Sequence, residues 1–309
     1  MSTNLKEATA KVTVVGLLAE KDLKVESANG VDIISGSVTI KVSDTDSIQF
    51  RVKQASKRSD GKKGYTSEDN KVYPGLVTVM NEYKSIADVG EADADRIAVI
   101  SGQIKPYFSV QNDREHLSYQ TNFFSRDRGV KDDNKAEFEV EIFIKAIVPE
   151  VYTSGEKQGD ETGRAIVKGL LPTYSGIETI DLVAPAEDGI ADAILSDYTP
   201  GQTVRFFGDV INRKVEKTTT VPVKIGKPKV TTSVTYTNEL VITGASEAYD
   251  GETGDTAPYD VNAIKQAMTE RDSRIAELKE KNKNNSNRGG NDASPSSSKP
   301  ASSGKNLPW

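Results

Sequence analysis

The chain has no cysteine, a single histidine and a single tryptophan, and none of its apolar runs is long enough to cross a bilayer as a helix. Without cysteine, disulfide bonds and thiolate metal sites are excluded, and a reducing cytoplasm is a fitting environment. Because His116 is the only histidine, no zinc site built on a histidine pair can form, and a Ser-His mechanism would depend on that one residue. The first residues lack the charged-then-apolar layout of a signal peptide. We therefore expect a cytoplasmic protein that is not attached to a membrane.

Loops that cradle nucleotide phosphates are missing as well, since the sequence contains neither GxxxxGK followed by Ser or Thr, nor GxGxxG. Two Asp-x-Asp pairs occur, Asp44/Asp46 and Asp93/Asp95, at places where strands are expected to turn or begin. Carboxylates in such places are usually solvated, and we interpret both pairs as turn residues and not as a metal site. These absences predict a binding protein with no cofactor and no enzymatic activity.

Hydrophobic residues are scarce, at 36% of a chain of 309 residues. That length has room for two ordinary domains and a tail, and the low hydrophobic content predicts that the polar C-terminal part is disordered. The formal net charge of −6 argues mildly against a nucleic-acid binder. Phosphate binding, however, depends on where the positive charge is concentrated and not on the total.

From residue 11 to about 244 the sequence reads as a series of short strands with alternating apolar residues. In the first half we expect strands at residues 11–18, 31–42, 47–53, 96–110 and 117–124. A stretch with helical spacing, residues 76–86, lies between the third and fourth of them. The same order repeats in the second half, with a helix at 190–198 and strands at 137–148, 163–171, 177–183, 203–213 and 239–243.

Three strands, a short helix and two further strands is the element order of the five-stranded OB barrel. We therefore predict a mainly β protein with two tandem OB-fold-like five-stranded barrels, a C-terminal helix and a disordered tail. Its expected parts are a first barrel at 1–130, a second barrel at 131–246, an acidic linker and helix at 247–280 and a tail at 281–309. A β-sandwich, such as those of phage capsid or tail subunits, is the alternative arrangement of so many short strands.

A resemblance is found in residues 191–214, ADAILSDYTPGQTVRFFGDVINRK. This stretch resembles the passage from helix to strand four in bacterial and phage single-stranded DNA-binding proteins, with a helix, a Pro-Gly turn, an alternating strand with an inner glycine, and basic residues. The whole chain looks like a phage-type member of that family. The resemblance implies binding and protection of single-stranded DNA without sequence preference, during (phage) DNA replication, recombination or repair. For a phage protein, the compartment is the host cytoplasm.

Binding of single strands needs cations along a groove and aromatic faces on which bases stack. The residues of a first cluster are concentrated on and after the third strand: Phe50, Arg51, Lys53, Lys57, Arg58, Lys62, Lys63, Tyr65 and Tyr73. A second cluster spans the fourth strand of the second half and the expected loop after it: Arg205, Arg213, Lys214, Lys217, Lys224, Lys227 and Lys229. A solvated loop is the plainer interpretation of either cluster alone. Two clusters in equivalent regions of an acidic chain favour a nucleic-acid partner.

The last residues are Leu307, Pro308 and Trp309, at the end of a basic, low-complexity segment. The tips of bacterial single-stranded DNA-binding proteins are similar in pairing proline with an aromatic, although their tails are acidic. We predict that these three residues bind replication or recombination proteins. Because two barrels share one chain, the tetramer of the single-barrel proteins does not carry over, although an oligomer remains open. A structural virion subunit is the alternative function.

Overall fold

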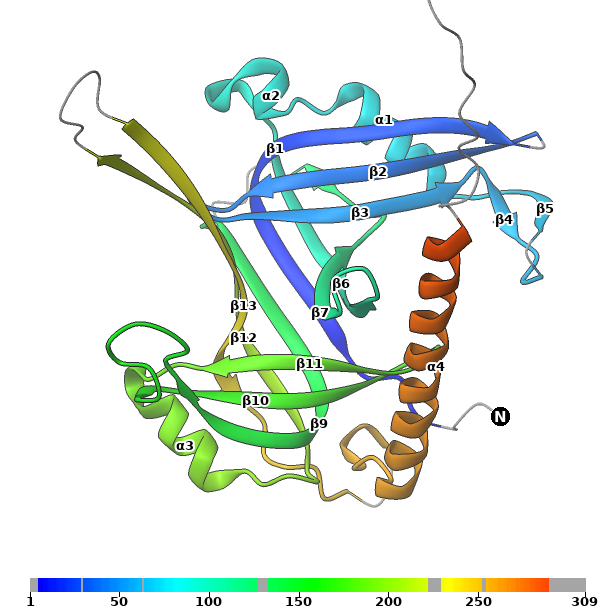
Figure 1. Ribbon diagram of the computed structural model, residues 1–309. Helices are drawn as coiled ribbons and strands as arrows, with labels where there is room; N and C mark the ends of the chain where they lie inside the picture. Colours follow the sequence, from blue (N-terminus) through cyan, green and yellow to red (C-terminus); the bar gives the residue numbers. More distant parts are fainter. Residues whose placement is uncertain are drawn as a thin grey trace, which may run out of the picture.

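The computed structural model describes residues 5–28, 30–62, 64–126, 133–221, 229–251 and 254–288 (Figure 1). Five of its strands form a first barrel. The strands are β1 (Ala10–Ala28), β2 (Val31–Lys41), β3 (Ser47–Ala55), β6 (Arg96–Ser109) and β7 (Arg114–Gln120). They pair in the order β1-β2-β3-β7-β6, and β6 pairs again with β1, so the sheet closes on itself. Every pairing is antiparallel except that of β3 with β7.

The second barrel repeats this order strand for strand. It consists of β9 (Lys135–Val151), β10 (Glu161–Thr173), β11 (Gly176–Ala184), β12 (Thr203–Val221) and β13 (Lys229–Ala245). The closed order is β9-β10-β11-β13-β12, with β12 pairing again with β9 and with β11 parallel to β13. Both barrels have a helical connection between their third and fourth strands. The prediction of two tandem five-stranded OB-like barrels is therefore confirmed.

The helical connections also lie where helical spacing predicted them. In the first barrel the connection consists of α1 (Tyr73–Glu82), α2 (Ile86–Val89) and a 3-10 turn at Glu91–Asp93. In the second barrel it consists of a 3-10 turn at Glu187–Gly189 and α3 (Ile190–Asp197). A two-residue strand, β8 (Ser125–Arg126), adds to β6 at the edge of the first barrel.

The two barrels share one continuous sheet because β1 also pairs with β9, from Ala10 opposite Val140 to Val15 opposite Lys135. Alternate residues of each strand point inward, and each barrel has a fully buried phenylalanine at its centre, Phe50 in the first and Phe206 in the second. Gly208 shows why a barrel strand contains glycine. A Cβ there would lie 1.9 Å from the carbonyl oxygen of Val241, at the bulge where the β12–β13 register shifts.

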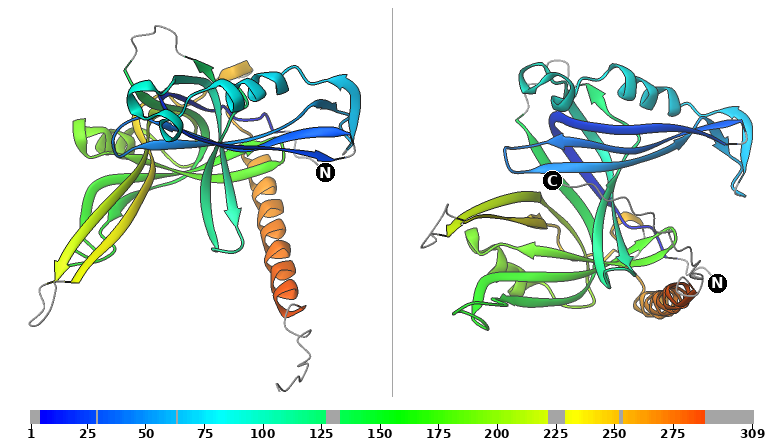
Figure 2. Two further views of the ribbon diagram at one scale, coloured as in Figure 1. Left: turned by 90° about the horizontal axis from the view of Figure 1, so that it is seen from above. Right: turned by 45° about the horizontal axis from the view of Figure 1, so that its top comes forward.

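Two segments for which the sequence predicted no strand form β-hairpins. The basic segment after β3 folds into β4 (Lys57–Ser59) and β5 (Tyr65–Asp69). The segment after residue 213, expected to be a loop, continues β12 and is paired by β13 from Lys214 opposite Tyr236 to Val221 opposite Lys229. This long ribbon, the β12–β13 arm, projects from the second barrel to the same side as the β6–β7 hairpin and the C-terminal helix (Figure 2, left).

The C-terminal helix, α4 (Val261–Arg288), follows a 3-10 turn at Gly254–Thr256. Asp260 caps it as expected, accepting a hydrogen bond of 2.7 Å from the amide of Ala263. Ile264 and Ala267 are buried with Phe143 and other residues of the second barrel, so the helix docks on that barrel. Residues 281–288, which we expected to be disordered, belong to this helix, and the rest of the predicted tail lies outside the described residues. None of the described helices is long and apolar enough to span a membrane.

Candidate nucleic-acid interface

Strand β3 separates the first cluster into core and surface residues by simple alternation. Ile48, Phe50 and Val52 point into the barrel, whereas Arg51 and Lys53 point outward and are exposed. Phe50 was predicted to bind DNA, and that prediction is wrong. Its ring is 0% exposed and packs edge-on against Tyr119 and Phe124, with ring centroids 6.3 Å and 6.1 Å away. A ring enclosed on all sides by the core has no face left for a base.

The outward residues of β3 form the floor of a concave surface, which we call the β3 groove. Its volume of about 530 Å³ lies within the range of about 300–1,000 Å³ found for ligand clefts. The walls come from residues 35–37 of β2 and from residues 120–122 at the end of β7, and Arg51 and Lys53 lie between them. The groove therefore occupies strands two and three of the first barrel, which is the usual oligonucleotide surface of OB folds.

A second concavity continues the β3 groove, because Lys53 lines both. Lys57 and the exposed ring of Tyr65 lie on its walls, together with Gly64 and Asn70 from the β4–β5 hairpin region. Four residues of the first cluster, Arg51, Lys53, Lys57 and Tyr65, are therefore brought together along one continuous surface. Tyr73 is different, since it packs partly into the barrel core at the start of α1.

The β4–β5 hairpin carries less free positive charge than the sequence suggested. Lys57 is paired with Asp69 at 2.6 Å and Arg58 with Glu68 at 2.7 Å, and both acids lie just beyond the basic run. Two backbone amides, those of Lys62 and Gly64, donate to Asp60 and hold the pKa of its carboxyl below its usual value. Lys63 lies outside the described residues. Among the described residues of the first cluster, the exposed positive charge that is not paired with an acid therefore lies on β3, at Arg51 and Lys53, and on the hairpin at Lys62.

An aromatic stack that was not among the predicted DNA-binding residues leads away from the β3 groove. The guanidinium of Arg51 lies 5.6 Å from the ring centre of Tyr107 on β6. Tyr107 in turn stacks on His116 of β7, with ring centroids 5.5 Å apart and an interplanar angle of 24°. Tyr107 and His116 face each other across the β6–β7 hairpin, whereas Arg51 joins them only because β3 pairs with β7 in the closed barrel, and spacing along the sequence could not reveal that contact.

In the second cluster, Arg205 was predicted to bind DNA, and the structure corrects this. Its guanidinium is held by Glu139 and Glu141 of β9, each at 3.2 Å. Glu141 is nearly fully buried and also accepts hydrogen bonds from the hydroxyls of Tyr249 and Tyr259. Burial, reinforced by Glu141, raises the pKa of both tyrosines above the ordinary value. Arg205 is therefore a structural residue of a buried polar network and is not available to a phosphate.

The remaining residues of the second cluster follow the β12–β13 arm. Arg213 is paired with Asp46 of the first barrel at 3.2 Å, and Lys214 with Glu216 at 2.6 Å. The side chains of Lys217 and Lys229 and the whole of Lys224 and Lys227 lie outside the described residues, so those four stay predictions. Tyr236, directly opposite Lys214, is 70% exposed and was missed by the sequence reasoning.

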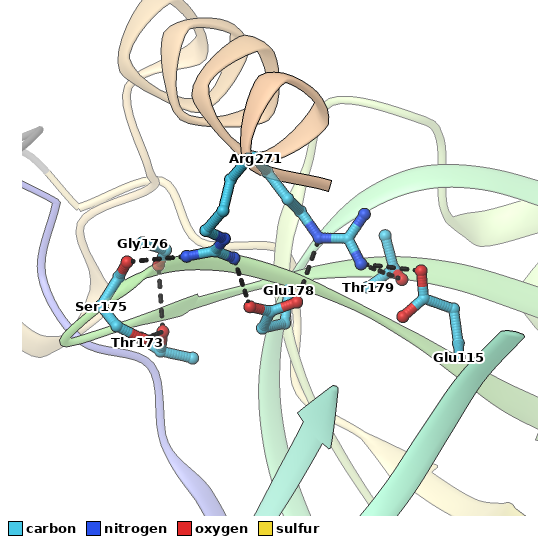
Figure 3. Close-up of polar contacts among 8 residues, drawn as sticks. Glu115, Thr173, Ser175, Gly176, Glu178, Thr179 and Arg271 are labelled. Carbon is cyan, nitrogen blue, oxygen red and sulfur yellow. Dashed lines mark hydrogen bonds and ion pairs between the residues drawn. The ribbon is translucent and has the colours of Figure 1, made fainter. Parts of the chain in front are cut away.

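The C-terminal helix covers the corresponding surface of the second barrel. Arg271 reaches from α4 to Glu178 on β11 at 3.1 Å and to Glu115 on β7 of the first barrel at 2.7 Å (Figure 3). Arg274 pairs with the other oxygen of Glu178 at 2.6 Å. Toward its far end, α4 places Lys279 2.5 Å from Asp113. The helix thus fastens strand three of one barrel to the β6–β7 hairpin of the other.

Comparisons with known proteins find a match to one protein family and a distant similarity to solved structures. The family described as YorF matches residues 9–281. The comparison with curated proteins finds no match. Among solved structures, the wild-type single-stranded DNA binding protein from Thermus aquaticus aligns with 12% identity and a TM-score of 0.42, covering 81% of this chain and 97% of that chain. A deletion mutant of the same protein aligns with 10% identity and a TM-score of 0.45, covering 81% and 98%. The fold assignment itself depends on the strand order within this chain.

Proposed function

The chain belongs to the YorF family, and we propose that it binds single-stranded DNA along the β3 groove of its first barrel, as a binding protein and not as an enzyme. In line with the resemblance described above, the activity we propose serves DNA replication, recombination or repair. Neither base preference nor catalysis is needed for a protein that coats and protects a single strand.

The observation that carries the proposal is the placing of Arg51 and Lys53 on the outer face of strands two and three of a five-stranded OB barrel. Cations along such a groove contact phosphates, and aromatic faces beside it stack bases at about 1–3 kcal/mol for each base. The exposed ring of Tyr65 at one end of the surface supplies such a face. Both requirements of sequence-tolerant binding are therefore met on one surface.

The second barrel contrasts with the first and supports this assignment. On its second strand, Arg164 is paired within the protein, bridging Glu150 at 3.3 Å and Glu239 at 2.8 Å. Glu178 on β11 is occupied by Arg271 and Arg274 of α4. Charges that are already paired gain little from phosphates, so we assign the main contacts to the first barrel.

Titration of a labelled oligothymidine, followed by fluorescence anisotropy at several salt concentrations, tests the proposed function. We expect binding whose log affinity falls with log salt by about 0.7 for each phosphate contacted, because each contact releases a counterion from the strand. A structural virion subunit, the alternative, is expected to leave the anisotropy unchanged at every salt concentration. Absence of binding at low salt would therefore overturn the proposal.

We also propose that Leu307, Pro308 and Trp309 bind partner proteins of DNA metabolism. This proposal depends on the sequence alone, since these residues lie outside the described part of the chain. Tryptophan is a frequent hot spot of protein interfaces, and an apolar tip after a polar segment offers such an anchor. Deleting residues 306–309 is expected to abolish co-purification of partners and to leave oligothymidine affinity unchanged. If the affinity falls instead, the tip contacts DNA and the partner role is wrong.

A further inference from the structure

We propose that the pocket between the two barrels receives one base of a bound strand and prefers a base with an amino group where thymine carries O4, which is cytosine (N4) or adenine (N6), over thymine. This inference rests on the proposed function and adds to it a specific binding site outside the β3 groove. It also predicts that the protein prefers certain bases at one position of the bound strand, although binding elsewhere along the strand does not depend on sequence.

The pocket lies where the first barrel faces the second. It has a volume of about 280 Å³ and is lined by residues 115–117 of β7, residues 179–181 of β11, and Asn238 of β13. Leu117 and Ile180 supply apolar surface, and the half-buried ring of His116 stands at one wall. Apolar surface with a few polar groups is the composition of sites that hold a planar ligand and orient it.

The walls of the pocket are held in place from behind by one buried side chain. Arg271 of α4 is only 5% exposed and donates to Glu115 on one wall at 2.7 Å and to Glu178 on the strand that forms the other at 3.1 Å (Figure 3). It also lies 3.4 Å from the hydroxyl of Thr179 in the pocket. Because a single guanidinium joins both barrels, the spacing of the two walls is set before a strand arrives.

Asp181 is the group that gives the pocket its selectivity. An ionised carboxylate only accepts hydrogen bonds, so it matches the amino group of cytosine, whereas the O4 atom of thymine is itself an acceptor. Partial burial raises the pKa of Asp181, and neighbouring Glu115 raises it further. Lys168 and Lys145 act in the opposite direction on this pKa. Both lysines are exposed on β10 and β9, where they can contact the phosphates on either side of the bound base.

The aromatic stack provides a path to the pocket from the β3 groove. Arg51 lies in the groove, Tyr107 contacts both Arg51 and His116, and His116 lines the pocket. A strand that follows these three side chains leaves the first barrel at the point where the second begins. Single-stranded bases recognised in proteins are commonly splayed out, stacked on aromatic or histidine rings and read along their hydrogen-bonding edges.

The test compares oligocytidine and oligothymidine of equal length in the same anisotropy assay, at neutral pH and fixed salt, with the full chain. Wild-type protein is expected to bind oligocytidine about fivefold or more tightly. The change Asp181→Asn is expected to remove this preference, because an amide can turn either its oxygen or its NH2 group toward the base. Asp209→Asn on β12 removes the same charge outside the pocket and is expected to keep the preference.

The outcomes separate the pocket from the proposed function. Equal binding of the two oligonucleotides by wild-type protein would overturn the pocket and leave single-strand binding intact. A preference that survives in Asp181→Asn would likewise assign the selectivity elsewhere. Failure of wild-type protein to bind either oligonucleotide would overturn both proposals. Unchanged thermal unfolding of Asp181→Asn establishes that a lost preference is not a loss of fold.

Discussion

Replacing Glu141 with alanine is expected to lower the free energy of unfolding by about 3 kcal/mol, the largest effect on stability that we predict for this chain. The side chain of Glu141 is 2% exposed and pairs with Arg205 at 3.2 Å. It also accepts a hydrogen bond of 3.0 Å from Tyr249 and another from Tyr259. Removing a buried partner leaves the others unsatisfied, which costs about 3–5 kcal/mol for an ion pair. The lower end applies because the side chain of Arg205 remains 28% exposed.

The position of this network explains why its loss affects more than one strand. Tyr249 and Tyr259 belong to the segment between β13 and α4, and the amide of Tyr259 also donates to the hydroxyl of Thr203 at 2.9 Å. Glu141 therefore ties the segment that leads into the C-terminal helix to the wall of the second barrel. Without it, we expect the docking of α4 to weaken together with the barrel.

Urea unfolding followed by far-ultraviolet circular dichroism measures the effect of Glu141→Ala. Glu139→Ala is the matched control, since Glu139 lies 3.2 Å from the same guanidinium but is 32% exposed. An ion pair of that exposure contributes about 1 kcal/mol or less. Equal losses in the two variants would show that the buried network has no special role.

Replacing both Arg51 and Lys53 with alanine is expected to weaken oligothymidine binding at least tenfold. Hydrogen bonds to charged groups contribute about 1.5–3 kcal/mol each, and tenfold in affinity corresponds to about 1.4 kcal/mol, so losing one good contact already suffices. The dependence of log affinity on log salt is expected to become shallower by about 0.7 for each lost phosphate contact. Both side chains are exposed and point away from the barrel core, so the fold should survive.

The control for this double variant removes the same charge elsewhere. Lys84, between α1 and α2, and Lys157, in the turn between β9 and β10, are exposed and lie outside the β3 groove. Their joint replacement with alanine should leave the affinity within about twofold, because exposed charges beyond a Debye length of about 8–10 Å are largely screened. If the control weakens binding as much as the groove variant, binding depends on overall charge and the assignment of the groove is wrong.

Which of the predicted residues are free to contact DNA depends largely on how the barrels close. Alternation along β3 places Phe50 and Arg51 on opposite faces, but only the closed sheet shows which face is the core. The acids that neutralise Lys57 and Arg58 lie across the β4–β5 hairpin, beyond the basic run in which the charge was counted. Arg205 reads as a basic strand residue, yet its partners Glu139 and Glu141 belong to β9, more than sixty residues earlier.

The two barrels, their helical connections and the capped start of α4 could be predicted from the sequence, because alternation, helical spacing and capping are local properties of the chain. The place where the barrels meet, the arm formed by β12 and β13, and the contacts of Arg271 with Glu115 and Glu178 depend on the folded structure. The pocket with His116 and Asp181 arises in the same way, from strands more than sixty residues apart. Contacts of this kind follow from how two closed sheets pack, and no local pattern in the sequence records that packing.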